Sequence, residues 1–237
     1  MKSKSLSIFL TALLAVAVAL FIITVSIGLP IYLRFFYYLQ IEPLNLPEKT
    51  GYDYATIKQA YDEMLNYLTL PNRDFGTGVF AFTAEGASHF ADCKVLFNLN
   101  VSVLIISTCT IAVLLTLSKL KIVTLYRPFK MHVSFISAVS ILSVFAIIGL
   151  LCAIDFNKAF VVFHNIFFAG KDNWTFSPNK DQIIQVLPQQ FFMNCGILIV
   201  SSIIILCVGI IVFQVIKRLK QSKSVKKFDN ELTGTQK

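Results

Sequence analysis

Long apolar runs without charged residues dominate the chain and alternate with shorter polar segments. Four of them reach the roughly 20 residues that a membrane-crossing helix needs. They are Ser5–Leu33, Val95–Ser118, Met131–Ile154 and the later part of Gln182–Ile216. Apolar residues without Gly make up 56% of the 237 residues, whereas apolar residues and Gly together make up about 45–50% of ordinary soluble domains. The pattern predicts an all-α membrane protein with transmembrane helices near 6–33, 95–118, 131–154 and 193–216.

The first apolar run is also compatible with a secretory signal peptide, because Lys2 and Lys4 precede it. Its length, however, far exceeds the roughly 7–15 residues of a signal-peptide core, and no A-x-A cleavage pattern follows it. We therefore expect a retained span. Four spans leave little chain for a soluble domain, so residues 1–237 are expected to form a single membrane domain.

The distribution of charge predicts the topology. The N-terminus, the 119–130 link and the 217–237 tail together hold 13 basic and 2 acidic residues, whereas the rest of the chain holds 8 basic and 11 acidic residues. The positive-inside rule then places both termini in the cytoplasm. An extracellular cap is expected from residues 34–94 and 155–192. The net charge of +8 is cytoplasmic, so it indicates contact with membrane lipid rather than nucleic acid.

The first outer loop contains a predicted amphipathic helix over residues 50–70. Its apolar positions recur at helical spacing; they are Tyr54, Ile57, Tyr61, Met64, Leu65 and Leu68. Thr50 and Asp53 are placed as a variant capping box. This helix is expected to cover a site in the cap. Further along, Thr83 can cap a helix that continues into the second span.

Candidate chemistry begins on that last helix. Glu85, His89 and Asp92 are four and three residues apart, so they share one helix face. A carboxylate near a histidine fixes its tautomer and raises its basicity, as a general base requires. The competing interpretation is an ordinary solvated helix start, where the helix macrodipole favours acidic residues.

A second histidine lies in the stretch FVVFHNIFFAGKDNWTFSP, residues 160–178. His164 is surrounded by Phe160, Phe163, Phe167 and Phe168, and Asn173 and Trp174 follow. Aromatic residues are favoured at a membrane interface, so an aromatic belt with an incidental histidine would give the same pattern. A belt does not require histidine, however, and His89 and His164 are both expected beside a membrane entry on the outer side. His132, at the cytoplasmic end of the third span, is expected to be an interfacial residue.

Other functions leave weaker traces in the sequence. His89, Asp92 and His164 could form a three-ligand metal site of a membrane hydrolase, although neither H-E-x-x-H nor G-x-S-x-G occurs. A four-span scaffold or binding protein would need no paired outer histidines. The later spans contain no acidic or basic residue of the kind that marks a transport pathway. Of the five cysteines, Cys93 and Cys195 lie near the outer surface and could pair, but their spacing matches no disulfide framework.

The order of these elements resembles the lipoprotein intramolecular transacylases of Gram-positive bacteria. The similarity rests on YLTLP at the end of the first-loop helix, the E-x-x-x-H-x-x-D-x-K element of residues 85–94, FHNIFFAGKDNWTFSP, and LPQQFF of residues 187–192. It implies a cell-membrane enzyme, without a cofactor or metal, whose substrates are diacylated bacterial lipoproteins. Such an enzyme moves the sn-2 acyl chain of the diacylglyceryl-cysteine to the α-amino group of the same cysteine, giving lyso-form lipoprotein. Cys93 stands where an aliphatic residue is expected.

The resemblance implies that His89 and His164 are catalytic, and the chemistry is compatible with this. An α-amine has a reference pKa of about 7.7–8.0, so a base near neutrality must take its proton, and histidine titrates in that range. A second histidine can stabilise the oxyanion. We take His89 as the base, with Glu85 and Asp92 in support. The expected substrate-binding residues are Tyr54, Phe160, Phe163, Phe167, Phe168, Asn173 and Trp174.

Overall fold

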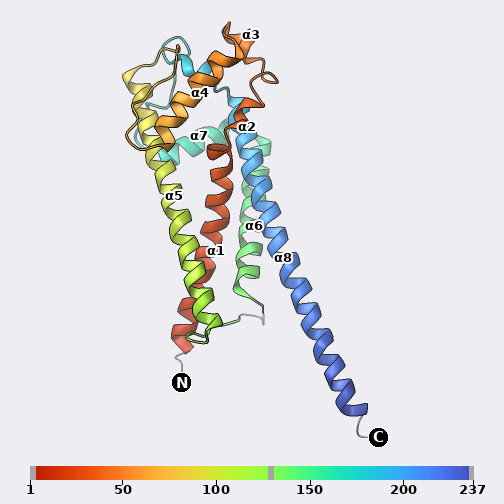
Figure 1. Ribbon diagram of the computed structural model, residues 1–237. Helices are drawn as coiled ribbons and strands as arrows, with labels where there is room; N and C mark the ends of the chain where they lie inside the picture. Colours follow the sequence, from red (N-terminus) through yellow and green to blue (C-terminus); the bar gives the residue numbers. More distant parts are fainter. Residues whose placement is uncertain (1–3, 128–130, 235–237) are drawn as a thin grey trace. The chain divides into compact units, whose positions relative to one another are not determined.

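Helices account for all the regular secondary structure in the part of the chain that the structure describes. The computed structural model describes residues 4–127 and 131–234, with side chains as far as residue 222. Figure 1 shows the helices α1 (Lys4–Tyr32), α2 (Phe35–Tyr38), α3 (Leu46–Thr50), α4 (Tyr54–Thr69), α5 (Ala84–Lys119), α6 (Val133–Ile154), α7 (Phe156–Phe167), the 3₁₀ helix η2 (Gln182–Gln185) and α8 (Gln189–Gly234). The all-α prediction is confirmed.

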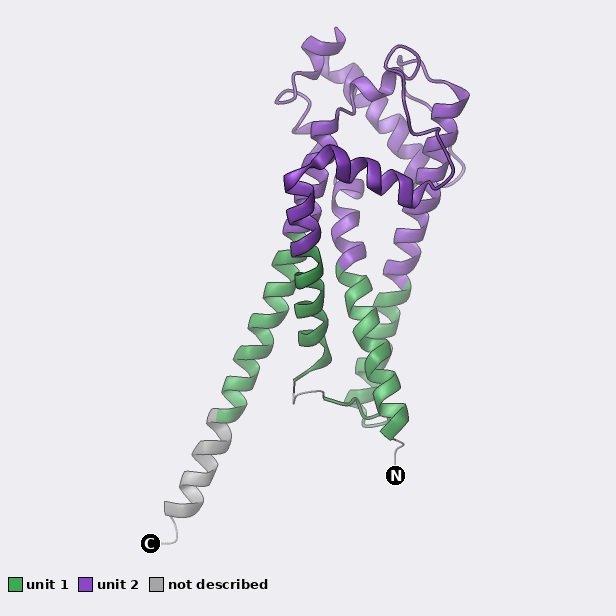
Figure 2. Ribbon diagram, turned by 180° about the vertical axis from the view of Figure 1, so that it is seen from behind, with its two compact units in different colours: residues 1–22, 106–145, 202–237 green, residues 23–105, 146–201 purple. Residues whose placement is uncertain are grey.

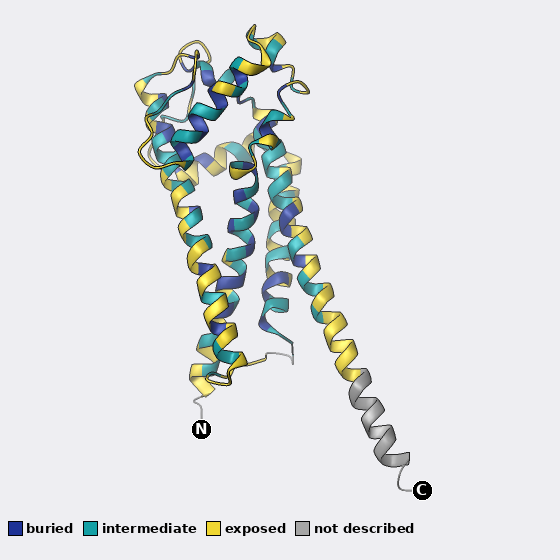
Figure 3. Ribbon diagram, in the orientation of Figure 1, coloured by how far each residue is buried: buried dark blue, intermediate teal, exposed yellow. Residues whose placement is uncertain are grey.

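Four of these helices are long and apolar enough to cross a membrane. They are α1, α5, α6 and, within α8, residues Gln189–Ser222. Much of the surface of α5 and α8 is exposed (Figure 3), and the exposed side chains include Ile105, Ile106 and Ile205. Such a surface is stable where lipid replaces water, because a helix satisfies its backbone polar groups internally.

The chain divides into two compact units, each of which draws on all four long helices (Figure 2). Unit 1 comprises residues 1–22, 106–145 and 202–237, and unit 2 comprises residues 23–105 and 146–201. Unit 1 therefore holds one part of each long helix. Unit 2 holds the other part together with α2, α3, α4, α7 and η2.

The core of unit 2 is aromatic at its centre. The ring of Tyr37 from α2 stacks on Tyr61 from α4 at a centroid distance of 3.7 Å, and its edge meets Phe191 of α8 at 5.2 Å. The buried hydroxyl of Tyr37 donates to the carbonyl of Val186 at 2.8 Å, so its polar atom is satisfied within the core. This cluster fastens α4 to the beginning of α8.

The helix α4 is shorter than predicted. It begins at Tyr54, with Asp53 as its N-cap accepting a hydrogen bond from the amide of Thr56 at 2.8 Å. Thr50 instead ends α3, and Gly51 follows it in the left-handed conformation at φ 76°, which glycine adopts at little cost. The predicted apolar face of α4 is buried from Ile57 to Leu68, whereas Tyr54 is exposed.

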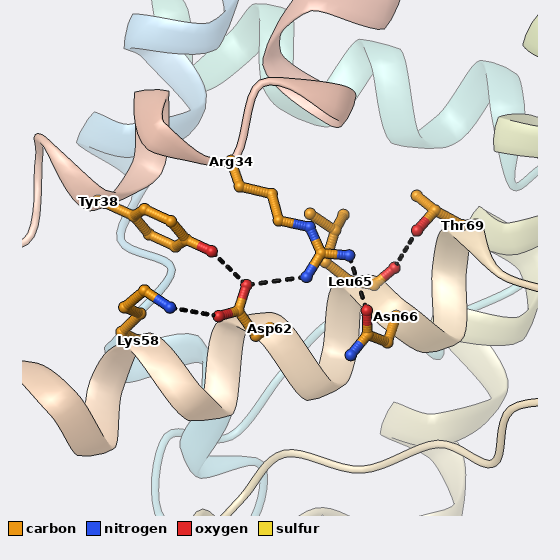
Figure 4. A network of polar contacts seen from close by, with 7 residues as sticks. All are labelled: Arg34, Tyr38, Lys58, Asp62, Leu65, Asn66 and Thr69. Atoms are coloured by element: carbon orange, nitrogen blue, oxygen red, sulfur yellow. Dashed lines mark hydrogen bonds and ion pairs between the residues drawn. The ribbon is translucent and has the colours of Figure 1, made fainter.

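A network of polar contacts anchors α4 to the segment after α1 (Figure 4). The carboxylate of Asp62 accepts from Arg34 at 2.9 Å, from Tyr38 at 2.5 Å and from Lys58 at 2.8 Å. Arg34 also donates to Asn66 at 2.7 Å. Burial alone would raise the pKa of Asp62, but the hydrogen bonds from Lys58, Tyr38 and Arg34 lower it below its usual value. The network fixes how α4 lies on α2.

Candidate active site

The first turn of α5 holds His89 in position. The Thr83 hydroxyl accepts from the amide of Gly86 at 3.0 Å and so caps the helix, as predicted. The Asp181 carboxylate accepts from the amide of Thr83 at 2.8 Å and from its hydroxyl at 2.7 Å. A Cβ at position 86 would collide with Asp181, so glycine allows the loop before η2 to lie directly on the start of α5.

His164 is presented by α7, which runs crosswise to the neighbouring ends of the long helices in unit 2 (Figures 1 and 2). The helix starts at Asp155, whose carboxylate accepts from the amide of Lys158 at 2.9 Å. One face of α7 buries His164. The other face leaves apolar side chains exposed, including Val162, Phe163 and Ile166. Such a helix suits a membrane surface, with one face toward protein and one toward lipid.

The two histidines from the outer segments meet in unit 2. Their ring centroids are 5.9 Å apart, and the side chains are 5% and 8% exposed for His89 and His164 respectively. Phe168 packs beside both imidazoles, and its ring centroid lies 4.7 Å from that of His89 and 5.6 Å from that of His164. Phe160 lies 4.2 Å and Trp174 4.8 Å from His164. Aromatic rings therefore enclose both imidazoles.

The hydrogen bond of His164 defines its tautomer. Its Nδ1 lies 2.8 Å from the carbonyl oxygen of Phe160. A carbonyl only accepts, so Nδ1 carries the proton and donates. The other nitrogen, Nε2, is then the basic one. Burial lowers the pKa of His164, and the hydrogen bond to Phe160 partly opposes this, so the ring is neutral near pH 7.

His89 makes a different contact. Its Nε2 lies 3.4 Å from Sγ of Cys93, one turn further along α5. Its Nδ1 is buried and, among the described residues, has no hydrogen-bond partner. A buried polar atom without a partner is costly in a folded protein. Such an atom is available to form a hydrogen bond with a polar group that enters the site.

Asp92 fastens the loop that carries Trp174. Its carboxylate accepts from Lys171 Nζ at 2.5 Å and from Asn173 Nδ2 at 3.0 Å. The indole of Trp174 donates to the carbonyl of Lys171 at 3.0 Å. The side-chain oxygen of Asn173 is buried and, within the described residues, has no partner. Asp92 thus holds the Lys171–Trp174 turn against α5.

Comparison with known proteins identifies the kind of enzyme to which these elements belong. The model of the family described as lipoprotein intramolecular transacylase Lit matches residues 12–192. The chain belongs to the lipoprotein intramolecular transacylase family. It is 25% identical to the membrane-integral lipoprotein intramolecular transacylase Lit from Bacillus cereus, with a TM-score of 0.80 over 92% of this chain and 100% of that one.

A variant of the Bacillus cereus transacylase with one histidine changed to alanine matches at 26% identity and a TM-score of 0.70, over 90% of this chain and 94% of that chain. The search of curated proteins found no match. The chain is therefore a membrane-integral transacylase that acts on lipoproteins, as the motifs predicted.

Not every predicted site residue of this transacylase lies by the histidines. Glu85 is exposed, and no described hydrogen bond or ion pair joins it to His89. Tyr54 is exposed at the start of α4 and has no described contact with either imidazole. Phe163 meets His164 edge-on at 5.4 Å, while Phe167 packs on Phe163 at 4.6 Å, and both are about half exposed. In the part of the chain that the structure describes, no group of three His, Cys, Asp or Glu side chains is arranged to hold a metal ion.

The structure adds residues to the site that the sequence did not place there. Cys93 contacts the imidazole of His89, and its spacing of one helical turn was the available signal. Cys93 and Cys195 are both free thiols. Lys171 and Asp181 link the second outer segment to α5, and Phe176 packs 5.4 Å from His89. Nothing in the local pattern indicated these longer-range partners.

Proposed function

We propose that His89 and His164 together catalyse transfer of the sn-2 acyl chain of a diacylglyceryl-cysteine lipoprotein to the α-amino group of the same cysteine. The observation that carries this proposal is the pair of enclosed imidazoles with their two free nitrogens. Among the described residues, Nε2 of His164 has no hydrogen bond and can accept a proton, and Nδ1 of His89 is buried without a partner. Acyl transfer from an ester to an amine needs one acceptor and one donor.

His164 is the base in this scheme, which revises the assignment to His89. The Phe160 carbonyl holds the proton on Nδ1, so Nε2 receives the proton that the attacking amine loses. A new C–N bond forms as the ester carbonyl becomes tetrahedral. When the intermediate collapses, the C–O bond to glycerol breaks, and His164 returns the proton to the glycerol oxygen. The base ends the cycle neutral and the atoms balance.

His89 is the donor. Imidazole nitrogen is a much better acceptor than thiol sulfur, so the Cys93 thiol donates to Nε2 of His89 across the 3.4 Å contact. The ring proton then lies on Nδ1, the buried atom without a described partner. An N–H group in that position hydrogen-bonds the oxyanion of the tetrahedral intermediate. A neutral donor suffices, because His164 carries the transferred proton.

The surrounding residues bind and fold the substrate. The Asn173 amide directs its nitrogen to Asp92, which leaves its buried oxygen to accept from an N–H of the substrate. Phe160, Phe168 and Trp174 enclose the imidazoles and exclude water. Nucleophile and ester belong to one molecule, so orientation alone can supply several kcal/mol of the barrier reduction. The exposed apolar face of α7 offers the acyl chains a path from the membrane.

The site faces outward in this proposal. The charge asymmetry supports cytoplasmic termini, so unit 2 with its outer segments belongs on the extracellular side of a multi-pass cell-membrane protein. Diacylated lipoproteins are anchored in that leaflet, with the modified cysteine at the membrane surface.

Mass spectrometry of lipoprotein N-terminal peptides tests the proposal. The chain is expressed in a bacterium that makes only diacyl lipoproteins, beside the variants His89→Ala and His164→Ala. Lys180→Ala, an exposed position in the same outer segment, is the matched control. The wild type and the control should give N-acylated, S-monoacyl peptides of unchanged total mass, and the two histidine variants should not.

Two results would contradict the proposal. Retained lyso-form product in both histidine variants would remove the dyad from the reaction. Loss of one acyl mass in the wild type would show that water rather than the amine takes the acyl chain, which is the activity of a hydrolase.

A further inference from the structure

Unit 1 contains two adjoining cavities that share His132. The first has a volume of about 440 Å³ and is lined by the segment between α5 and α6, including Lys121, Tyr126 and Arg127. The second is a groove of about 520 Å³ lined by α1, α5 and α8, with Lys217 and His132 among its residues. Both volumes fall in the range of small-ligand sites, about 300–1,000 Å³.

The first cavity is cationic. Lys121 and Arg127 line it directly, and Lys217 lines the adjoining groove that shares His132. Within unit 1, residues 1–22, 106–145 and 202–222 contain no Asp or Glu, and Asp229 and Glu231 lie beyond the side chains that the structure describes. The charged side chains that line the two cavities, among them Arg127 and Lys217, are therefore all basic, which favours an anionic ligand.

The groove is apolar over most of its length. Leu14 and Ile22 come from α1, Ile111 and Leu115 from α5, and Phe213 from α8. Its polar groups include His132 and Ser134, which hydrogen-bond each other at 2.9 Å, and Gln214, which donates to Ser134 at 3.1 Å. The polar and apolar parts of the two cavities thus form one amphiphilic site.

We propose that this site binds an anionic phospholipid of the cytoplasmic leaflet. The phosphate lies against Arg127 and Lys217, and one acyl chain fills the groove. A free phosphate would leave the groove unused, and an apolar helix would bring no negative charge to Arg127 and Lys217. The positive-inside rule accounts for basic residues in the cytoplasmic segments, but not for their meeting beside an apolar groove lined by three transmembrane helices. The proposal does not depend on the histidine chemistry of unit 2.

Native mass spectrometry of the purified full-length protein tests this, with phosphatidylglycerol and phosphatidylcholine as probes. Lys217→Gln removes a cation from the site. Lys220→Gln is the control, because Lys220 belongs to the same helix but lines neither cavity. A basic residue in contact with the lipid phosphate contributes about 1 kcal/mol to binding, which is about a fivefold change in affinity. Phosphatidylglycerol should therefore bind Lys217→Gln about fivefold more weakly, with Lys220→Gln and Lys217→Arg unchanged.

A second pair of variants tests the groove. Ala112 lines it, whereas its neighbour Val113 does not and is exposed. Ala112→Phe should fill the groove and abolish the phosphatidylglycerol adduct, while Val113→Phe should retain it. The proposal is overturned if both lipids bind equally, or if the groove variants change only the formation of a dimer. It is also overturned if Lys217→Gln binds phosphatidylglycerol as tightly as Lys220→Gln, and Ala112→Phe as tightly as Val113→Phe. Transacylase activity of each variant, measured in parallel, reports separately on unit 2.

Discussion

The contact between Cys93 and His89 makes a quantitative prediction about catalysis. Cys93→Ala removes the thiol that lies 3.4 Å from His89 Nε2. Cys93→Ser keeps a donor, although the shorter C–O bond requires a shift of a few tenths of an ångström to reach the ring. Cys195→Ala is the matched control, because Cys195 is also a free, partly buried thiol packed against the core of unit 2. Cys195→Ala removes the same thiol group at a position away from the imidazole of His89.

The expected effect follows from the worth of one hydrogen bond. A net contribution of about 1 kcal/mol changes the equilibrium between the two imidazole tautomers about fivefold. In the proposed mechanism, only the tautomer with its proton on Nδ1 of His89 donates to the oxyanion. We therefore expect kcat to fall about threefold to tenfold in Cys93→Ala with little change in KM, because the lost interaction acts in the transition state. Cys93→Ser should lie between Cys93→Ala and the wild type.

The assay is conversion of a synthetic diacyl lipopeptide to its lyso form by purified enzyme, followed by liquid chromatography and mass spectrometry. A second measurement reads the tautomer directly, from ¹⁵N chemical shifts of histidine-labelled protein. The chain has only three histidines, so each can be assigned by substitution. The reasoning is refuted if Cys93→Ala leaves kcat and the His89 shifts unchanged, or if Cys195→Ala lowers kcat equally.

Four further outcomes are expected. Asp92→Ala should release the turn that holds Trp174, the only tryptophan; its fluorescence should shift to the red and activity should fall about tenfold or more. Gly86→Ala should lower the Tm, because the added Cβ collides with a loop carboxylate, an overpacking that costs about 1–3 kcal/mol. Asp62→Asn, which weakens three hydrogen bonds, should lower stability by about 1–2 kcal/mol, as a thermal shift would show. The rate should rise from pH 6 to 8, because burial lowers the pKa of His164 and the α-amine, at about 7.7–8.0, loses its proton last; a pH–rate profile with its acid limb near 6.5 would contradict this.

The sequence predicts those features that depend on local pattern. The length of an apolar run determines whether a helix can cross a membrane, so the four long helices were expected. The cap formed by Thr83 and the buried face of α4 also follow from local spacing. The two histidines were recognised because an aromatic belt beside a membrane entry does not require a titratable ring.

The partners of those histidines were not predictable in the same way. Helical spacing puts Glu85 and Asp92 on the face of His89, and this suggested a carboxylate supporting the ring. In the structure, the Asp92 carboxylate binds Lys171, 79 positions away, and Glu85 is exposed. Which group an acid binds depends on where a distant loop lies, and no periodicity encodes that.

The enclosure of the site explains why transfer rather than hydrolysis is the expected outcome. A base and an oxyanion donor would activate water as well as an amine. What differs is the concentration of each nucleophile at the ester. The ring centroids of Phe160 and Trp174 lie 4.2 and 4.8 Å from that of His164, the proposed base, and these rings limit the entry of water. The amine, in contrast, arrives covalently tied to its ester, with a high effective concentration. Opening this enclosure should therefore raise the share of hydrolysed product before it lowers the total rate of ester cleavage, because the acid–base chemistry of His89 and His164 would persist.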